Sequence, residues 1–393
     1  MSISRADKSR FAAWWFTVDH VLLSALAALM VIGLVLSLAA SPAVAIKKGF
    51  ATYYFVERHV FFLGLGAVLM LAVSFFNPVG VRRLALALLA VMMALMALVL
   101  LSGAEINGAK RWLSFAGHSF QPSEFAKPGF IVIMAWLFGE AAHRRDVPAL
   151  PLAIGLWALF AGLLVSEPDV GQTVLISATA GVIYLMAGLP LIGAFALMAV
   201  GGVGLWLAYQ NFGHVQSRLD RFFSSLPFEN FQVDRAMQSF AEGGLFGRGP
   251  GEGTIKSVLP DAHTDFIFAV VAEEYGVIAC LVLVALFAFV VLRALIRAAE
   301  EPQAADRLAI QGLAVVFGLQ ALINMGVNVS LLPPKGMTLP FISAGGSSML
   351  ALSLTAGMLL ALTRRRPDAA RLKKPRLVPT IEDMEFEGSK SLR

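Results

Sequence analysis

The sequence predicts an all-α integral membrane protein of about ten transmembrane helices. Of its 393 residues, 58% are hydrophobic and only 15% are charged, whereas about a quarter of the residues of a soluble domain carry a charge. Apolar runs of about 20 residues, the length that crosses a bilayer, recur along most of the chain. These two observations exclude a soluble globular protein.

Ten apolar runs are predicted to span the membrane, with edges set to within several residues. They cover residues 20–40, 59–76, 83–102, 125–141, 149–165, 170–188, 191–209, 265–292, 308–330 and 345–363. The first run follows the basic segment RADKSR and resembles a signal peptide, but it is longer than a signal core of about 7–15 residues. It is therefore predicted to remain as the first helix. No internal repeat indicates a transporter built from inverted halves.

The positions of Lys and Arg predict the orientation of the helices. With the N-terminus inside, the short inner loops hold Arg82, Arg83, Arg144 and Arg145, the bias that cytoplasmic loops show. The net charge of +5 is then explained by the excess of Lys and Arg on the cytoplasmic side of the membrane. No basic stripe interleaved with aromatic residues indicates a nucleic-acid partner. The single cysteine, Cys280, excludes an internal disulfide.

The predicted organisation has three parts. Residues 1–19 form a cytoplasmic N-terminal segment, and residues 20–363 form the ten-helix membrane domain. Residues 364–393 form a basic cytoplasmic tail, whose many charges, prolines and low apolar content predict disorder.

Three polar segments fall on the outer side in this orientation: residues 103–124, the large loop 210–264 between the seventh and eighth helices, and the turn 331–344. The concentration of polar segments on the outer side is the first indication of function.

The first outer segment contains GAKRWLSFAGHSFQPSEFAK, in which Lys110 and Arg111 precede a Trp. Glu124 follows Pro and Ser at the expected start of the fourth helix, where a negative charge is favourable. Lys127 lies inside that helix, where an unpaired ammonium is costly. An ordinary interfacial loop is the alternative, since Trp and Lys are common at the headgroup level.

The tight turn SEPDVGQT places Glu167 and Asp169 between the fifth and sixth helices, at the level where a cation or Lys127 could meet them. A simple helix connection, with Asp169 at a helix start, is an equal alternative.

The large loop contains a helical pattern, QVDRAMQSFAEGG, that ends at a Gly pair. Arg248 lies among the alternating glycines that follow. They do not form a nucleotide-binding loop, because no Gly-Lys-Ser/Thr follows them and a Pro interrupts them. A hinge, or a backbone wall that a bulky substrate can approach closely, is the more modest interpretation.

The turn LLPPKGMTLPFISAGGSS leads into the last helix. Helix-start amides together with Lys335 suit an anionic group, and Ser347 belongs to this helix start. A proline-rich turn with a capped helix is the alternative.

The stretch LPDAHTDFIFAVVAEEYG carries the most acidic residues at the mouth of an apolar run. Asp265 is predicted at the membrane–water boundary, with His263 two residues before it. Glu273 and Glu274 fall on other faces of the helix and are predicted to be structural partners of buried cations. His263 and Asp265 could hold a divalent cation, although two ligands do not make a metal site, and no metal is assigned.

One carboxylate among many cations suits a particular chemistry. A soluble glycosidase needs a second carboxylate to protonate a poor leaving group. A sugar that leaves as a lipid pyrophosphate needs only a base for the attacking hydroxyl and positive charge for the pyrophosphate. Such a donor is already activated, so the reaction needs no ATP outside the cell.

Five motifs together resemble those of the SEDS family of bacterial peptidoglycan glycosyltransferases, in the family's order and across nearly the whole membrane region. They are KRWLSFAGHSFQPSEFAK, SEPDVGQT, GGLFGRGPGEG, LPDAHTDFIFAVVAEEYG and LLPPKGMTLPFISAGGSS. The sequence LLPPKGMTLPFIS and the basic tail favour the division branch of the family over the elongation branch. Ala344 is a departure, since many members have Tyr there.

The resemblance implies a fold, an activity and partners. It implies ten helices with both termini cytoplasmic, in the bacterial inner membrane at the division septum. The implied activity is polymerisation of lipid II, the undecaprenyl-pyrophosphate-linked disaccharide pentapeptide, with inversion. The implied partners are a class B penicillin-binding transpeptidase of the FtsI type and other division membrane proteins.

The resemblance also implies roles for particular residues. Asp265 is expected to be the general base. The expected substrate-binding residues are Lys110, Arg111, Lys127, Arg248, His263, Lys335, Ser343 and Ser347. The expected supporting residues are Glu124, Glu167, Asp169 and Glu274. The only cofactor envisaged is a divalent cation.

Two other functions use the same residues. A lipid II flippase should place polar groups near the membrane midplane with gates on both sides, whereas here they crowd the outer ends and the inner loops are plain. A non-catalytic scaffold would tolerate replacement of Asp265 by Asn without losing an enzymatic product.

Overall fold

The computed structural model describes residues 7, 9–106, 109–115, 118–144, 146–211, 213, 216, 220, 231–334 and 336–365. These residues divide into two compact units, one of residues His20–Thr363 and a smaller one from the two chain ends. The smaller unit contains the helix α1 (Arg10–Trp15). The predicted disordered tail lies outside the described residues from residue 366 onward.

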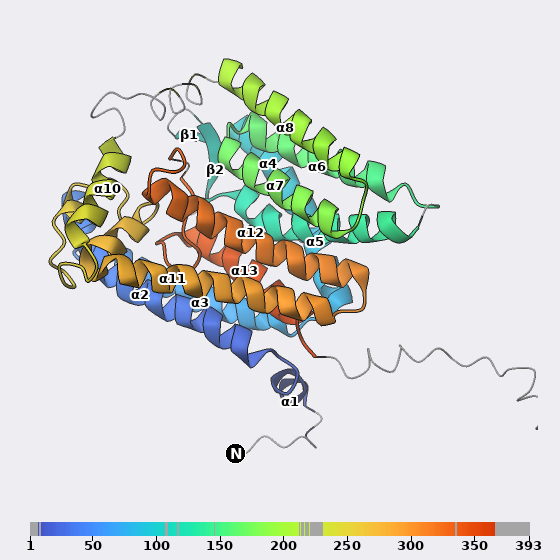
Figure 1. Cartoon of the computed structure of the whole chain (residues 1–393), viewed down its shortest axis with the longest axis horizontal. Helices are drawn as coiled ribbons and strands as arrows, with labels where there is room; N and C mark the ends of the chain where they lie inside the picture. The colour runs from blue at the N-terminus through green and yellow to red at the C-terminus, as the bar shows by residue number, and fades with distance from the viewer. Residues whose placement is uncertain are drawn as a thin grey trace, which may run out of the picture. The chain divides into compact units, whose positions relative to one another are not determined.

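The larger unit is built from apolar helices (Figure 1). They are α2 (His20–Lys47), α3 (Tyr54–Ser74), α4 (Pro78–Ser102), α5 (Pro122–His143), α6 (Ala149–Ser166), α7 (Val170–Met186), α8 (Leu191–Asn211), α11 (Ile267–Glu300), α12 (Ala304–Asn328) and α13 (Gly346–Leu362). Eight of the described helices are long and apolar enough to cross a membrane, and α7 and α13 are shorter apolar helices. Each corresponds to one of the predicted spans, so the multi-pass helical fold is confirmed.

The core of the unit is helix α5, which is buried from Pro122 to Gly139 except at Trp136. It packs against α4 on one side and α12 on another, while α13 packs along α3. Outer helices such as α4 instead expose apolar side chains, among them Leu86 and Leu101. Exposed apolar surface of this kind is expected on helices that face lipid.

The segment 103–120 contains strands that were not predicted from the sequence. It forms an antiparallel sheet of the order β1-β2-β3, from β1 (Ala104–Ile106), β2 (Ala109–Phe115) and β3 (His118–Phe120). Lys110 pairs with Glu105 across the first ladder, and Leu113 pairs with Phe120 across the second. The sheet fixes the direction in which neighbouring β2 residues point.

The large loop contains the predicted helix, α10 (Phe231–Gly243), followed by a short 3-10 turn (Ile255–Ser257). The chain after α10 packs against α11 at a break, where Gly276 has a φ of 81°. One continuous helix was predicted there from the sequence. Val277 and Ile278 donate to carbonyls of the α10 end, so neighbouring chain satisfies the interrupted backbone groups.

Candidate active site

The three predicted outer segments meet around one large cavity of about 1080 Å³. Its wall includes side chains of the sheet and the start of α5, of the α10 and 261–266 segments, and of the turn before α13. Arg58, Phe61 and Phe62 of α3 complete it. This volume exceeds that of a typical pocket for a drug-sized ligand, so the cavity can hold a bulky substrate.

Asp265 lies on this wall, in the turn that precedes α11. Asn324 and Asn328 of α12 each donate a hydrogen bond to the Asp265 main-chain carbonyl, both at 2.9 Å. Gly336 lies opposite with a φ of 65°, and a β-carbon there would stand 3.7 Å from Asp265 Oδ2. The backbone of the carboxylate is therefore held from α12, and the turn before α13 passes close to it.

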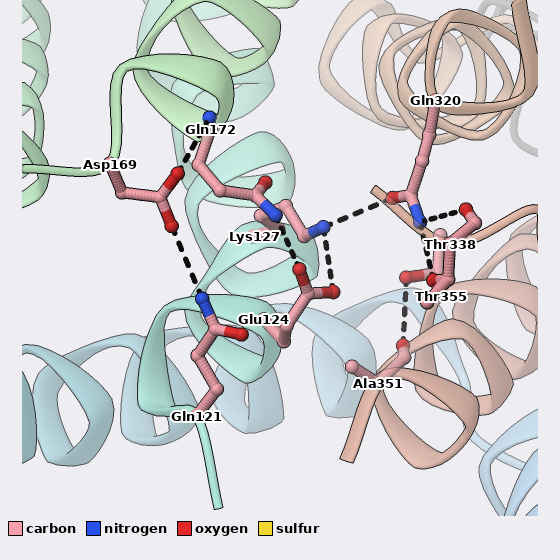
Figure 2. Close-up of polar contacts among 9 residues, drawn as sticks. All are labelled: Gln121, Glu124, Lys127, Asp169, Gln172, Gln320, Thr338, Ala351 and Thr355. Carbon is pink, nitrogen blue, oxygen red and sulfur yellow. Dashed lines mark hydrogen bonds and ion pairs between the residues drawn. The ribbon is translucent and has the colours of Figure 1, made fainter. Parts of the chain in front are cut away.

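Another part of the cavity wall, which includes Gln121, Glu124, Asp169 and Gln172, belongs to a buried polar network, shown in Figure 2. Asp169 accepts hydrogen bonds from the Gln121 side chain at 3.2 Å and from the Gln172 backbone at 3.3 Å. The Gln172 side chain donates to Glu124. Glu124 pairs with Lys127 at 2.8 Å, and both are buried. A buried ion pair is stable only when hydrogen bonds complete it in this way.

The network continues to the turn that faces Asp265 (Figure 2). The Lys127 Nζ donates to Gln320 Oε1 at 3.0 Å, and the Gln320 amide donates to the Thr338 carbonyl at 3.1 Å. Asn324, one helical turn further along α12, donates to the Met337 carbonyl at 2.7 Å. Side chains of α12 thus connect the ion pair on α5 with the backbone around the carboxylate.

Arg111 reaches from β2 to the turn between α6 and α7. Its Nε donates to the Glu167 carbonyl at 3.0 Å, its guanidinium also donates to the Pro168 carbonyl, and Nη1 lies 3.9 Å from Asp169 Oδ1. Arg111 remains on the cavity wall. It therefore joins the sheet to the turn and brings positive charge to the cavity.

The two acidic residues of this turn are strongly affected by burial. Burial raises the pKa of Glu167 to about 8, assisted by the charge of Asp169 and opposed by Arg111. Burial also raises the pKa of Asp169, opposed chiefly by Arg111. Glu167 is thus largely protonated at neutral pH and does not provide an anionic ligand.

His263 and Ser343 are buried beside the cavity rather than on its wall. The Ser343 hydroxyl donates to the Thr264 carbonyl at 2.5 Å and accepts from the Leu339 amide at 2.8 Å. Burial lowers the pKa of His263 to about 4, with Lys48 adding to the effect and Asp261 opposing it. The imidazole is therefore neutral near pH 7.

The acidic pair deeper in α11 belongs to the fold around the break. The Glu274 carboxylate pairs with buried Lys256, as expected. The expected cation partner of Glu273 was wrong: its carboxylate accepts three backbone N–H groups, of Thr254 at 2.6 Å, Ile255 at 2.7 Å and Lys256 at 3.1 Å. The sequence could not show that a turn would fold back over this carboxylate.

The structure brings part of the predicted site together. The predicted residues on the cavity wall are Arg111, Glu124, Asp169, Asp265 and Ser347. The described residues that do not line it are Lys110, Lys127, Glu167, Arg248, His263, Ser343 and Glu274. Lys335 lies outside the described residues.

Two of the predicted features have other roles. Arg248 is half-exposed and pairs with Glu242, so it is directed away from the cavity wall. The alternating glycines after α10 permit close approach to α11 rather than to a substrate, since a β-carbon at Gly247 would collide with the Glu274 carbonyl. No group of three His, Cys, Asp or Glu side chains within the described ranges could hold a metal ion.

Several residues of the cavity wall and of its supporting hydrogen bonds were missed, although each leaves a signal in the sequence. Arg58 is a cation at the mouth of an apolar run, and Gln172 follows the SEPDV turn. Gln320, Asn324 and Asn328 recur every four residues within the apolar α12, a spacing that places them on one helix face. Polar side chains at this spacing inside a span indicate a functional or structural contact.

The arrangement can activate a hydroxyl group. Asp265 offers a carboxylate beside a cavity that also presents Arg58 and Arg111. A carboxylate can accept a proton from a nucleophile, while guanidinium groups stabilise negative charge on a leaving group. The wall also has the aromatic side chains Phe61, Phe62 and Trp112, which suit a lipid-linked molecule.

Comparisons with known proteins show the family of this chain. The family of cell cycle proteins described as FtsW, RodA and SpoVE matches residues 19–367. A protein of Caulobacter vibrioides named probable peptidoglycan glycosyltransferase FtsW is 45% identical over 369 residues, which cover 94% of this chain and 95% of that protein. A protein of the same name from Trichlorobacter lovleyi is 35% identical over 357 residues, 88% of this chain and 93% of its own.

Solved structures show the same fold. The rod shape determining protein RodA of Thermus thermophilus has a TM-score of 0.64 at 28% identity, covering 89% of this chain and 97% of its own. A chain of a structure described as "Structural coordination of polymerization and crosslinking by a peptidoglycan synthase complex" has a TM-score of 0.70 at 29% identity, covering 88% and 97%.

Proposed function

This chain belongs to the FtsW, RodA and SpoVE family of cell cycle proteins, the SEDS family, and on that premise we propose that it is a peptidoglycan glycosyltransferase of the FtsW type. It polymerises lipid II into glycan strands on the outer face of the cytoplasmic membrane. The observation that carries this proposal is the large cavity that has Asp265 and Arg111 on its wall.

Asp265 acts as the general base in the proposed mechanism. It takes the proton of the acceptor 4-hydroxyl as the hydroxyl oxygen bonds to the anomeric carbon of the donor sugar. The bond from that carbon to the lipid pyrophosphate breaks in the same step, so the configuration inverts. The leaving pyrophosphate needs no proton, and nearby cations such as Arg111 stabilise its charge.

The polar network supports this reaction by holding the cavity in shape. Glu124 and Lys127 fix the start of α5, and Gln320 with Asn324 holds the turn that faces Asp265. A reacting group must be held within a fraction of an ångström of the productive geometry. Hydrogen bonds at both ends of the network provide this constraint.

The partner we propose is a class B penicillin-binding transpeptidase that cross-links the new strands at the division septum. The similarity to a chain of a peptidoglycan synthase complex supports such a partner. The similarity to FtsW proteins supports the division role over the elongation role.

The test is polymerisation of labelled lipid II by the purified protein with its transpeptidase partner in liposomes, with cross-linking blocked. Wild type should produce glycan ladders. Asp265→Asn should reduce the rate by about 10²–10⁴-fold, the usual contribution of a general base. Asp261→Asn is the matched control, since Asp261 lies in the same loop and on the same wall but pairs with Lys48 at 3.8 Å.

Three results would count against the proposal. Equal ladders from wild type and Asp265→Asn would remove Asp265 as the base. Equal losses in Asp265→Asn and Asp261→Asn would indicate a general charge effect. Absence of ladders, with lipid II crossing the bilayer of the same liposomes, would indicate a flippase instead.

A further inference from the structure

A second cavity lies against α3, on the side of the loop that carries His263. It has a volume of about 180 Å³ and is lined by Phe55, Arg58, His59, Phe62, His263 and the backbone of residues 344–346. Arg58, Phe62 and residues 344–346 also line the large cavity. This side pocket therefore shares a wall with the proposed active site.

The side pocket contains buried nitrogen atoms without partners. His59 is 2% exposed, and neither of its ring nitrogens has a hydrogen-bond partner within the described part of the chain. His263 is 5% exposed, and its Nδ1 also lacks a partner there. A buried polar group without a partner destabilises the fold, so such groups in a native protein require an explanation. A ligand that accepts hydrogen bonds provides one.

The groups around the pocket are donors. A neutral imidazole carries one N–H group, and Arg58 contributes a guanidinium whose carbon lies 6.0 Å from the Tyr54 ring and 5.9 Å from the Phe62 ring. The first turn of α13, a helix of 17 residues, begins at Gly346 on the pocket wall. Helix-start amides and the helix dipole favour an anion. None of the residues that line the pocket is acidic.

The small side chain of Ala344 leaves this space open. Ala344 lines both cavities and stands at the position noted above as a departure from the family motif. Its amide donates to the His263 carbonyl at 2.9 Å, which holds the two walls of the pocket together.

We propose that the side pocket is an accessory phosphate-binding site, which holds a phosphate group of a lipid-linked diphosphate while the rest of that molecule occupies the large cavity. The inference rests on the proposed function for the identity of the lipid. His59 and His263 donate hydrogen bonds to the phosphate oxygens, and Arg58 supplies positive charge from the shared wall. The site adds affinity for a lipid-linked diphosphate whose bond to the sugar is not the one that breaks, such as that of the acceptor, or for the released undecaprenyl diphosphate.

The test measures binding separately from polymerisation. The full-length protein in detergent is titrated with undecaprenyl diphosphate, and its thermal stabilisation gives an apparent Kd. His59→Phe removes the donors but keeps a ring, and Ala344→Tyr fills the pocket from the opposite wall. Each should weaken binding by about tenfold, the effect of losing one hydrogen bond to a charged group. In the polymerisation assay, KM for lipid II should rise by a similar factor and kcat should change much less.

The controls distinguish binding through the phosphate group from binding through the lipid chain. His143→Phe is the matched control, because His143 lies at the end of α5 and bonds to the Gly139 carbonyl at 2.9 Å. Undecaprenol, which has no phosphate, should bind wild type and variants equally. If both variants also weaken binding of inorganic diphosphate, a free anion occupies the same site; if only the lipid-linked form is affected, the site requires the lipid.

Unchanged binding of undecaprenyl diphosphate by both variants, with wild-type thermal stability, would overturn the inference. Equal weakening for undecaprenol would also overturn it, because the pocket would then act on the lipid chain. A wild-type protein that binds undecaprenyl diphosphate through these residues but makes no glycan would contradict the proposed glycosyltransferase and leave this site standing.

Discussion

The two ends of the stretch 259–276 carry the same kind of side chain in opposite surroundings. Near its start, Asp265 lies on the wall of the large cavity. Near its end, Glu273 and Glu274 are fully buried and bind three backbone amides and a lysine. The difference separates acidic residues that stabilise a membrane fold from one that can act on a substrate. Because the three residues lie close together in the sequence, their surroundings distinguish them: backbone amides and a lysine bind Glu273 and Glu274, whereas Asp265 lies on the cavity wall.

The largest expected effect on stability is that of Glu274→Gln. It removes the charge that neutralises Lys256, whose Nζ would keep only neutral acceptors, namely the glutamine oxygen and the carbonyls of Ala39 and Gly251. Breaking a buried ion pair in this way costs about 3–5 kcal/mol. Thermal unfolding in detergent should show a large loss, whereas Asp265→Asn should stay close to wild type.

The double variant Glu274→Gln/Lys256→Met sharpens this test. It removes both charges, so most of the lost stability should return. A double variant as unstable as the single variant would mean that the ion pair is not the cause.

The next effect is that of Gly276→Ala at the break in α11. Its φ of 81° suits glycine, and a β-carbon would collide with the Leu245 carbonyl. We expect a loss of about 2–3 kcal/mol from strain and displacement together. Gly188→Ala is the matched control, because it has a φ of 72° but open space around it, so it should cost about 1 kcal/mol. Equal losses would leave no role for the close packing at the break.

Glu273→Gln should have a smaller effect, because the glutamine keeps one oxygen for the amides of residues 254–256. Each buried amide left without an acceptor costs about 1–3 kcal/mol. Unfolding should show this loss, and Glu252→Gln, at an exposed residue of the same loop, should show almost none. A Glu273→Gln protein that is fully stable but inactive would reverse the comparison and make Glu273 a functional residue.

The substitution at Glu167 differs from the others, because it is expected to raise stability and because its effect depends on pH. Its pKa in the folded protein is about 8, mainly because of burial, whereas an exposed Glu has a pKa of about 4.3. The folded state therefore binds more protons than the unfolded state between these values, and stability falls as the pH rises through this range. Glu167→Gln should raise Tm relative to wild type at about pH 8 and have little effect at about pH 4. An equal effect at both pH values would contradict the raised pKa.

The sequence was sufficient for the helices but not for the backbone between them. Long apolar runs are set by composition alone, so all the predicted spans have a helix in the structure. The break at Gly276 depends on hydrogen bonds from residues 244–249, and no local pattern shows a partner so far away in the sequence. The sheet of residues 104–120 was missed for a similar reason, since each strand is short and only the pairing stabilises it.

The candidate site was predicted in part for the same physical reason. Asp265, Glu124 and Asp169 were identified because an acidic group near an apolar run is costly and conspicuous. Arg248 looked equivalent to Arg111 in the sequence, but its pairing with Glu242 directs it away from the cavity. Asn324 and Gln320 were missed because neutral amides are less conspicuous than charges, although their hydrogen bonds hold the cavity wall.

The break at Gly276 separates the first part of α11 from the rest of the helix, and Asp265 lies near the far end of that first part. Asp265 precedes Gly276 by about 11 residues, roughly 16.5 Å along a helix, and a tilt of about 10° would move the far end by roughly 2.9 Å, close to the length of a hydrogen bond. Two backbone hydrogen bonds hold the chain at the break: the Arg248 amide donates to the Glu273 carbonyl at 2.9 Å, and the Gly249 amide donates to the Glu274 carbonyl at 3.0 Å. These backbone bonds at the break, together with the two α12 amides that donate to the Asp265 carbonyl, therefore limit how far this part of α11 can tilt.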